Sequence, residues 1–129
     1  METLKLEIVT PQGGIFNDDV KMVTVPGKEG EFGILPAHAS LISLLSAGVI
    51  EYIKTDDKKG LIAINWGHVK IEESGVTILA DGAVAISGTN GDVKKRLEEA
   101  NALIASISDS DVAIAAAKSK LESAAKGLL

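Results

Sequence analysis

Glycine and proline are distributed very unevenly along this chain. Residues 1–91 contain 12 of the 13 glycines and all three prolines, and the remaining glycine is Gly127, close to the end. Glycine and proline interrupt helices and mark the turns between strands. The first part of the chain is therefore predicted to consist of short strands joined by turns, and the alanine-rich remainder to be helical.

The hydrophobic pattern of the first part supports this division. Leu4, Leu6 and Ile8 alternate with Lys5 and Glu7, which is the period of a half-buried strand. Further strands are predicted at 20–25, 41–45, 49–53, 61–66, 69–72, 76–80 and 83–87. Short strands separated by turns at such spacing are typical of a β-sandwich or barrel. The predicted fold class is α+β, mainly β, with a sandwich of about ten short strands over residues 1–88.

From Asp92 the apolar residues take the spacing of a helix. The first stripe consists of Val93, Leu97, Ala100, Ile104 and Ile107. Ser108 and Asp111 then resemble a capping box, which indicates that a second helix begins there. Residues 89–129 are therefore predicted to form an antiparallel hairpin of two helices, at about 92–107 and 110–127.

The apolar stripes of this hairpin are rich in alanine, which buries little area. At about 25 cal/mol per Å2, an alanine seam docks more weakly than a leucine seam. We infer a hairpin that is loosely held against the sandwich and able to leave it. The alternative is a fixed packing appendage.

Two predicted strands, 41–45 and 61–66, are apolar on both faces. A strand in a two-layer sandwich needs only one buried face. The other face is expected to be covered by the chain's own helices or by another protein, and the sequence leaves both explanations open.

The net charge of −5 arises entirely in residues 1–91, which hold 12 acidic and 7 basic residues, whereas residues 92–129 hold 6 of each. An acidic chain with 3% aromatic residues is a poor ligand for nucleic acids and for anionic membranes. The acidic start Met1-Glu2-Thr3 does not look like a secretory signal, and no apolar run reaches the roughly 18 residues of a membrane span. The sequence predicts a soluble, cytoplasmic protein.

No motif indicates an enzyme. Gly27-Lys28 lacks the rest of a phosphate-binding loop. His38 and Ser40 lack a third catalytic group, and a chain with no cysteine and two distant histidines has no metal-ligand spacing. No catalytic residue, metal site or cofactor is predicted.

The segment from Pro26 to His38 contains two prolines and three glycines, which exclude a continuous helix or a central strand. We interpret it as a loop in which Phe32 either fills one end of the core or contacts a partner. The run Glu29-Gly30-Glu31-Phe32-Gly33-Ile34-Leu35-Pro36-Ala37-His38 resembles the Glu-Gly-Glu-(Leu/Phe)-Gly-(Val/Ile)-x-Pro-x-His signature of the epsilon subunit of bacterial F-type ATP synthases. The segments 6–11, 44–50 and 76–81 resemble the same family, in order and at matching spacing.

This resemblance implies a non-catalytic rotor subunit in the central stalk. Such a subunit couples proton-driven rotation of the membrane c ring to ATP synthesis in the catalytic head of alpha and beta subunits, at the cytoplasmic face of the bacterial inner membrane. It implies a c-ring contact through Glu29, Gly30, Glu31 and Phe32, and a gamma contact through Thr10, His38 and Ser43. The alternative is a free-standing β-sandwich adaptor or regulatory protein that is not involved in energy coupling.

In this family the hairpin can reach the catalytic head and inhibit ATP hydrolysis, and in some members it binds ATP through Ile-Asp-x-x-Arg-Ala. This chain reads Gly91-Asp92-Val93-Lys94-Lys95-Arg96-Leu97, so that lysine stands at the arginine position. Lysine lacks the planar fork that binds phosphate, which argues against ATP binding. Asp92, Lys95 and Arg96 remain candidate ATP-binding or regulatory residues, and inhibition by the hairpin remains a hypothesis.

Overall fold

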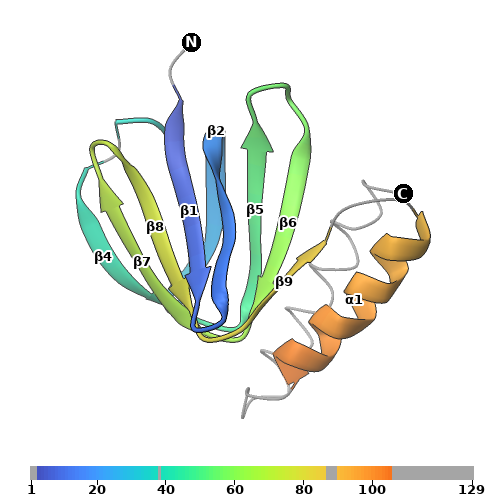
Figure 1. Cartoon of the computed structure of the whole chain (residues 1–129). Helices are drawn as coiled ribbons and strands as arrows, with labels where there is room; N and C mark the ends of the chain where they lie inside the picture. The colour runs from blue at the N-terminus through green and yellow to red at the C-terminus, as the bar shows by residue number, and fades with distance from the viewer. Residues whose placement is uncertain (1–2, 38, 87–89, 106–129) are drawn as a thin grey trace.

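The computed structural model describes residues 3–37, 39–86 and 90–105, and these form nine strands and one helix. In chain order they are β1 (Leu4–Thr10), β2 (Gly13–Gly27), β3 (Gly30–Ile34), β4 (Leu41–Leu45), β5 (Gly48–Lys54), β6 (Lys59–Ile64), β7 (Gly67–Glu72), β8 (Gly75–Ala80), β9 (Ala83–Ile86) and α1 (Asn90–Ala105). The strands form a layered structure, and α1 lies on its outside, against β9 and β6 (Figure 1).

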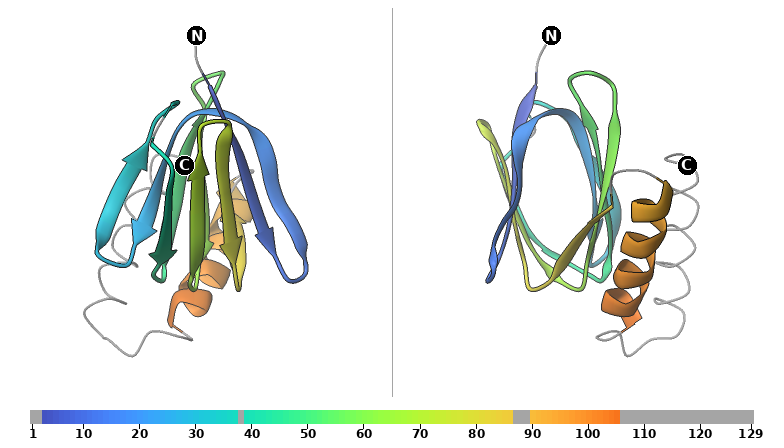
Figure 2. Two further views of the ribbon diagram at one scale, coloured as in Figure 1. Left: turned by 90° about the vertical axis from the view of Figure 1, so that its left-hand side faces the viewer. Right: turned by 45° about the vertical axis from the view of Figure 1, so that its right-hand side comes forward.

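The long strand β2 belongs to both layers of the sandwich. Its first part pairs with β1, and its second part pairs with β5 and β3. One layer therefore contains β4, β7, β8, β1 and the first part of β2, and the other contains β9, β6, β5, β3 and the second part of β2. Figure 2 shows the two layers facing each other. Among the described strands, only β1 and β8 pair in parallel.

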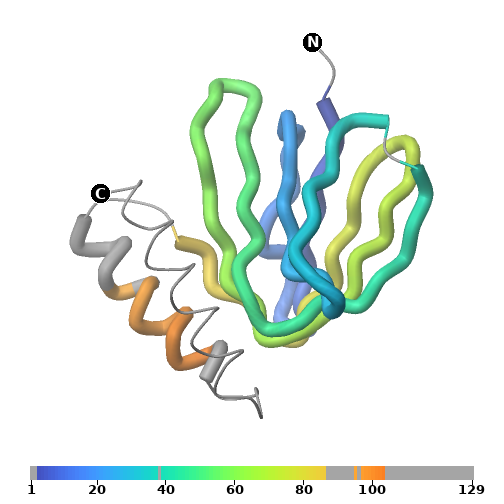
Figure 3. The backbone as a smooth tube through the Cα atoms, turned by 180° about the vertical axis from the view of Figure 1, so that it is seen from behind, coloured from blue at the N-terminus to red at the C-terminus, as the bar shows by residue number. Residues whose placement is uncertain are grey.

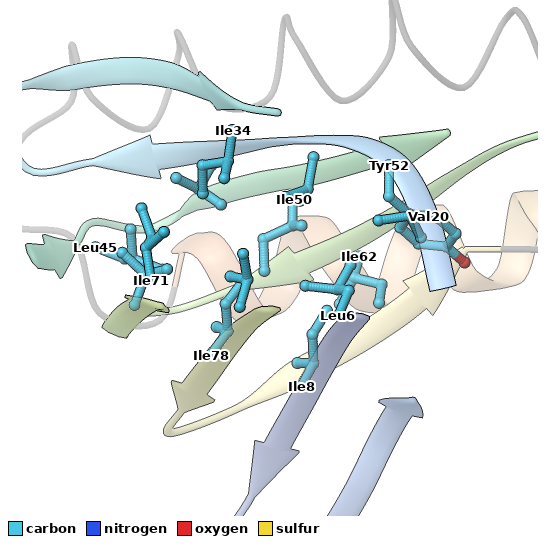
Figure 4. Packing of buried hydrophobic residues seen from close by; sticks show 14 of the residues in the cluster. Leu6, Ile8, Val20, Ile34, Leu45, Ile50, Tyr52, Ile62, Ile71 and Ile78 are labelled. Carbon is cyan, nitrogen blue, oxygen red and sulfur yellow. The ribbon is translucent and has the colours of Figure 1, made fainter. Parts of the chain in front are cut away.

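The core lies between the layers and takes alternate residues from each strand. Leu4, Leu6 and Ile8 of β1 are buried whereas Lys5 is exposed, so the predicted period is confirmed. Figure 4 shows side chains from both layers meeting in the core, including Leu6, Ile8, Val20, Ile34, Leu45, Ile50, Tyr52, Ile62, Ile71 and Ile78. Because burial of each large aliphatic side chain contributes about 1.5–3 kcal/mol, this core is the main source of stability.

Strand β6 is buried on both faces, and α1 covers the outer one. A second apolar cluster contains Val49, Leu61, Ala63 and Ile86 of the sheet and Ala100 of α1, with Leu97 packed against it. The explanation that the chain's own helix covers a doubly apolar strand is therefore confirmed for β6. It does not hold for β4, whose outer face is exposed.

Three details of the predicted strands differ from the structure. The described part of residues 26–38 contains no helix, but Pro26 and Gly27 end the central strand β2, and the interpretation as a loop is also wrong for Gly30–Ile34, which forms β3. Among the described strands β3 pairs only with β2, and such an edge position tolerates Gly30 and Gly33. Strand β2 also begins at Gly13 rather than near Val20, and the described residues contain nine strands rather than about ten.

The first predicted helix, at about 92–107, corresponds to α1, which runs from Asn90 to Ala105 in the described residues. The second, at 110–127, lies outside the described residues, and so does the hairpin turn. The two-helix hairpin and the domain boundary after residue 88 stay predictions.

Candidate interaction surfaces

The segment that carries the family signature is the hairpin of β2 and β3. Gly27 pairs with Gly30, so Lys28 and Glu29 form its exposed two-residue turn. Gly30 has a φ of 139°, which residues with a side chain rarely adopt. A Cβ on Gly27 would lie 2.6 Å from the Gly30 carbonyl oxygen and 2.8 Å from the Phe32 ring. Both glycines are therefore required by this tight turn.

Glu31 and Phe32 follow the turn and lie differently in it. Glu31 is exposed, whereas Phe32 is half-buried and packs against the main core. The interpretation that Phe32 fills one end of the core is therefore confirmed. Phe32 also lines a groove of about 480 Å3 between the hairpin and residues 41–44 of β4. Figure 3 shows β3 and β4 on either side of this part of the molecule.

The outer face of the β4–β7–β8 layer carries several exposed apolar side chains next to the charged Lys70 and Glu72. Ile42 is 70% exposed, Leu44 is 45% exposed and Leu79 is 55% exposed. Leu44 lies opposite His68, and His68 lies opposite Leu79, so the three side chains form one row across the sheet. Trp66 lies beside this row, with its ring centroid 6.1 Å from that of His68. We call Ile42, Leu44, Trp66, His68 and Leu79 the outer apolar face.

Thr10, a predicted gamma contact, lies at the margin of this face. It lines a groove of about 320 Å3 together with Trp66, His68 and Leu79. Its own hydroxyl is engaged in the β1–β2 turn, where it donates to the Gly13 carbonyl oxygen at 3.1 Å and accepts from the Gln12 N–H at 3.3 Å. Thr10 therefore shapes the border of the outer apolar face and exposes little side chain to a partner.

Ser43, the second predicted gamma contact, lies on β4 but not on the outer apolar face. It pairs with the buried Val69, is half-buried, and donates from Oγ to the Leu44 carbonyl oxygen at 3.4 Å. It lines the groove beside Phe32. The structure thus places Thr10 and Ser43 at two different grooves, and the third residue, His38, lies outside the described residues.

The sequence analysis does not single out Trp66 or Leu79. The alternation of His68, Lys70 and Glu72 in the sequence is typical of a solvated strand face, and this interpretation fits Lys70 and Glu72, which are exposed and form an ion pair of 3.0 Å. A signal was present in residues 76–80, where Leu79 is the apolar residue at an outward position. Its row with Leu44 depends on pairing between distant strands, which local periodicity does not report.

In the part of the chain that the structure describes, no three His, Cys, Asp or Glu side chains gather as metal ligands. Burial, together with the charge of Asp18, raises the pKa of the Tyr52 phenol above its usual 10.0. Lys95 is exposed on α1, whereas for Asp92 and Arg96 only the helical backbone is described.

No helix within the described residues is both long enough and apolar enough to span a membrane.

Comparison with known proteins gives closely similar sequences. Residues 3–86 match the family described as ATP synthase, Delta/Epsilon chain, beta-sandwich domain. A protein of Sulfurovum sp. (strain NBC37-1), named ATP synthase epsilon chain, is 56% identical over 126 residues, which cover 98% of each chain. A protein of the same name from Wolinella succinogenes is 53% identical over 130 residues, covering 100% of this chain and 99% of that one. A chain in the cryo-EM structure of the Euglena gracilis mitochondrial ATP synthase, OSCP/F1/c-ring, matches with a TM-score of 0.62 and 25% identity, covering 93% of this chain and 73% of that chain.

Proposed function

The chain belongs to the epsilon-chain family of ATP synthases, and we propose on this basis that it is a non-catalytic subunit in the central stalk of such a complex. The observation that carries the proposal is the identity of 53% and 56% to epsilon chains over nearly the whole length of both chains. In this role the subunit turns with the rotor and couples proton-driven rotation of the c ring to ATP synthesis by the alpha and beta subunits. It is then a peripheral component at the cytoplasmic face of the bacterial inner membrane.

The c-ring contact in this proposal is the tip of the β2–β3 hairpin. Glu29, Gly30 and Glu31 are exposed, and the paired strands hold them in a defined position. Phe32 contributes less directly, because much of its ring packs inward and fixes the base of the hairpin. Since single ion pairs at a surface contribute little, the fixed shape of the tip is expected to supply specificity.

The gamma contact in this proposal includes the outer apolar face. Its large exposed side chains have no role in the core, and an apolar patch of this kind marks a protein interaction site. Thr10 lies at its border and in this proposal shapes the groove that gamma contacts. Ser43 is accessible only through the neighbouring groove, so a gamma subunit that contacts both must extend around the edge of β4.

The hairpin of residues 89–129 is the proposed inhibitor of ATP hydrolysis, acting through the alpha and beta subunits. The support is the alanine-rich stripe of α1: among the helix side chains that the structure describes, Ala100 is fully buried and Leu97 is partly buried. Alanine buries little area, so the helix can exchange this position when another surface accepts its apolar stripe. ATP binding is not part of the proposal, because the arginine of the ATP motif is replaced by Lys95.

The test of this function is proton pumping driven by ATP hydrolysis in membranes that contain the assembled complex. Glu31→Lys reverses a charge at the proposed c-ring contact and should reduce pumping relative to hydrolysis. Glu73→Lys is the matched control, because Glu73 is also an exposed acidic residue and lies in the β7–β8 turn, at the other end of the strands from the β2–β3 turn (Figure 3). Equal pumping by both variants would contradict the role of the hairpin tip. Failure of the unmodified chain to assemble with gamma and the c ring would contradict the proposed function itself.

A further inference from the structure

One buried side chain, Asn65, ties together two turns that are distant in the sequence. It lies between β6 and β7 and is only 4% exposed. Its side-chain oxygen accepts hydrogen bonds from the N–H groups of Trp66 and Gly82, both at 2.8 Å. Its side-chain nitrogen donates to Asp81 Oδ2 at 3.0 Å. We call Asn65, Trp66, Asp81 and Gly82 the clasp.

The backbone strengthens the clasp. The Asp81 N–H donates to the Trp66 carbonyl oxygen at 3.1 Å, and the Asn65 N–H donates to the Gly82 carbonyl oxygen at 3.3 Å. Three of the four hydrogen bonds that an asparagine side chain can make are therefore formed by Asn65 with the two turns. A buried polar network of this kind holds its members in one geometry.

The clasp has contacts on two sides of the molecule. On one side, Trp66 and Asp81 line the groove at the border of the outer apolar face. On the other side, a Cβ placed on Gly82 would lie 3.0 Å from Leu103 Cδ1 of α1. Glycine thus leaves the space into which Leu103 packs, and Leu103 rests on the same turn that Asn65 holds.

This contact is one of those that position α1 in the described part of the chain. Leu97 and the small Ala100 also pack against the sheet. A shift of the β8–β9 turn would move the surface beneath Leu103 and, through Asn65, the backbone of Trp66.

We propose that the clasp couples the docking of α1 to the binding of a partner on the outer apolar face. A partner that packs against Trp66 orders the clasp and thereby stabilises docked α1, and docked α1 raises the affinity of that face for the partner by the same factor. The identification of the partner as gamma rests on the proposed function. The link from the clasp to α1 is independent of it.

Hydrogen exchange on the full-length chain tests the link. Asp81→Ala removes an exposed carboxylate and its hydrogen bond to Asn65, and α1 amides should exchange roughly tenfold faster, as expected for the loss of one charged hydrogen bond. Asp56→Ala is the matched control, because the Asp56 carboxylate accepts from the Lys58 N–H at 3.1 Å in a turn remote from α1. Unchanged exchange in α1 of Asp81→Ala would overturn the proposal.

The reverse direction uses a variant that leaves the sandwich core intact. Leu103→Ala should accelerate exchange of the Trp66 and Gly82 amides, which both donate to Asn65, while β1 and β8 amides keep their protection. Unchanged Trp66 and Gly82 exchange in this variant would overturn the link even if Asp81→Ala destabilised the whole fold.

Added gamma subunit should slow α1 exchange in the unmodified chain and have a smaller effect in Asp81→Ala. If gamma binds without slowing α1 exchange, the coupling is refuted. If gamma does not bind, the proposed function is refuted, and the exchange measurements on Asp81→Ala and Leu103→Ala still decide the link from the clasp to α1.

Discussion

Truncation of Ile42 to alanine gives a direct test of the outer apolar face. The side chain is 70% exposed, so most of its surface remains available for burial by a partner. Full burial of an isoleucine contributes about 1.5–3 kcal/mol, and 70% of this is about 1–2 kcal/mol. Alanine keeps only the first carbon of the side chain, so the expected loss of affinity for gamma is about 1 kcal/mol, or roughly fivefold in Kd.

The same numbers predict that the subunit itself is barely affected. Only the buried 30% of the side chain is lost from the folded state, which costs about 0.5–1 kcal/mol. Calorimetric titration with the matching gamma subunit would give the affinity, and thermal unfolding followed by circular dichroism would give the stability. The expected result is a weaker complex formed by a subunit with nearly unchanged Tm.

Ile53→Ala is the control for this experiment. Ile53 lies on β5 opposite Met22 and Lys59, on the outer face of the other layer, and is half-buried. It removes the same atoms from a surface that the proposed gamma contact does not include. An unchanged Kd for Ile42→Ala, or an equal loss for Ile53→Ala, would refute the assignment of gamma to the outer apolar face.

Three further predictions concern the hairpin and stability. ATP hydrolysis by the matching catalytic head should be higher with residues 1–91 than with the full chain, and equal rates would indicate that the hairpin is a fixed structural element. Ala37 has a φ of 65°, so Ala37→Gly should raise the free energy of unfolding by about 0.5–1 kcal/mol in denaturant titrations, because the relieved strain of about 1–2 kcal/mol exceeds the added chain entropy. The raised pKa of Tyr52 means that the unfolded chain loses this proton first, so stability should be complete below pH 10.0 and fall as the pH rises toward the folded pKa. Tyr52→Phe should reduce that fall, and identical pH profiles for both proteins would contradict it.

Local periodicity predicts the parts of the fold that depend on neighbouring residues. Alternation at Leu4, Leu6 and Ile8 gives β1, and the spacing of Leu97 and Ala100 gives the face of α1 that packs on the sheet. Local sequence does not predict the edge strand β3, because its glycines argue against the interior of a sheet. Strand β3 holds Gly30 and Gly33 at an edge, where the loss of side-chain packing costs little.

The interaction surfaces were predicted less well, because they are assembled by long-range pairing. Leu44, His68 and Leu79 become one row only when β4, β7 and β8 align in register. None of the three has a distinctive local sequence. The resemblance in sequence identified Thr10, which lies at the border of this face, but it could not show that the Thr10 hydroxyl is already engaged within its own turn.

The two doubly apolar strands show how the chain divides its surface between itself and a partner. The outward Ala63 of β6 is small and admits α1, which then covers Leu61, Val49 and Ile86. These three large side chains would be exposed if α1 left, at a cost of about 4 kcal/mol or more. The alanine content of the helix by itself predicts weak docking. The large side chains of the sheet beneath α1 oppose its release, because they would be exposed to water.

A cost of about 4 kcal/mol keeps an isolated subunit in the docked form, with roughly one molecule in a thousand released. Release must then be an exchange, in which another surface accepts the apolar stripe of the helix, rather than spontaneous fraying. In the proposed function the alpha and beta subunits provide that surface. Inhibition by the hairpin should therefore depend on the catalytic head, and α1 of the free chain should stay protected from hydrogen exchange at every accessible concentration.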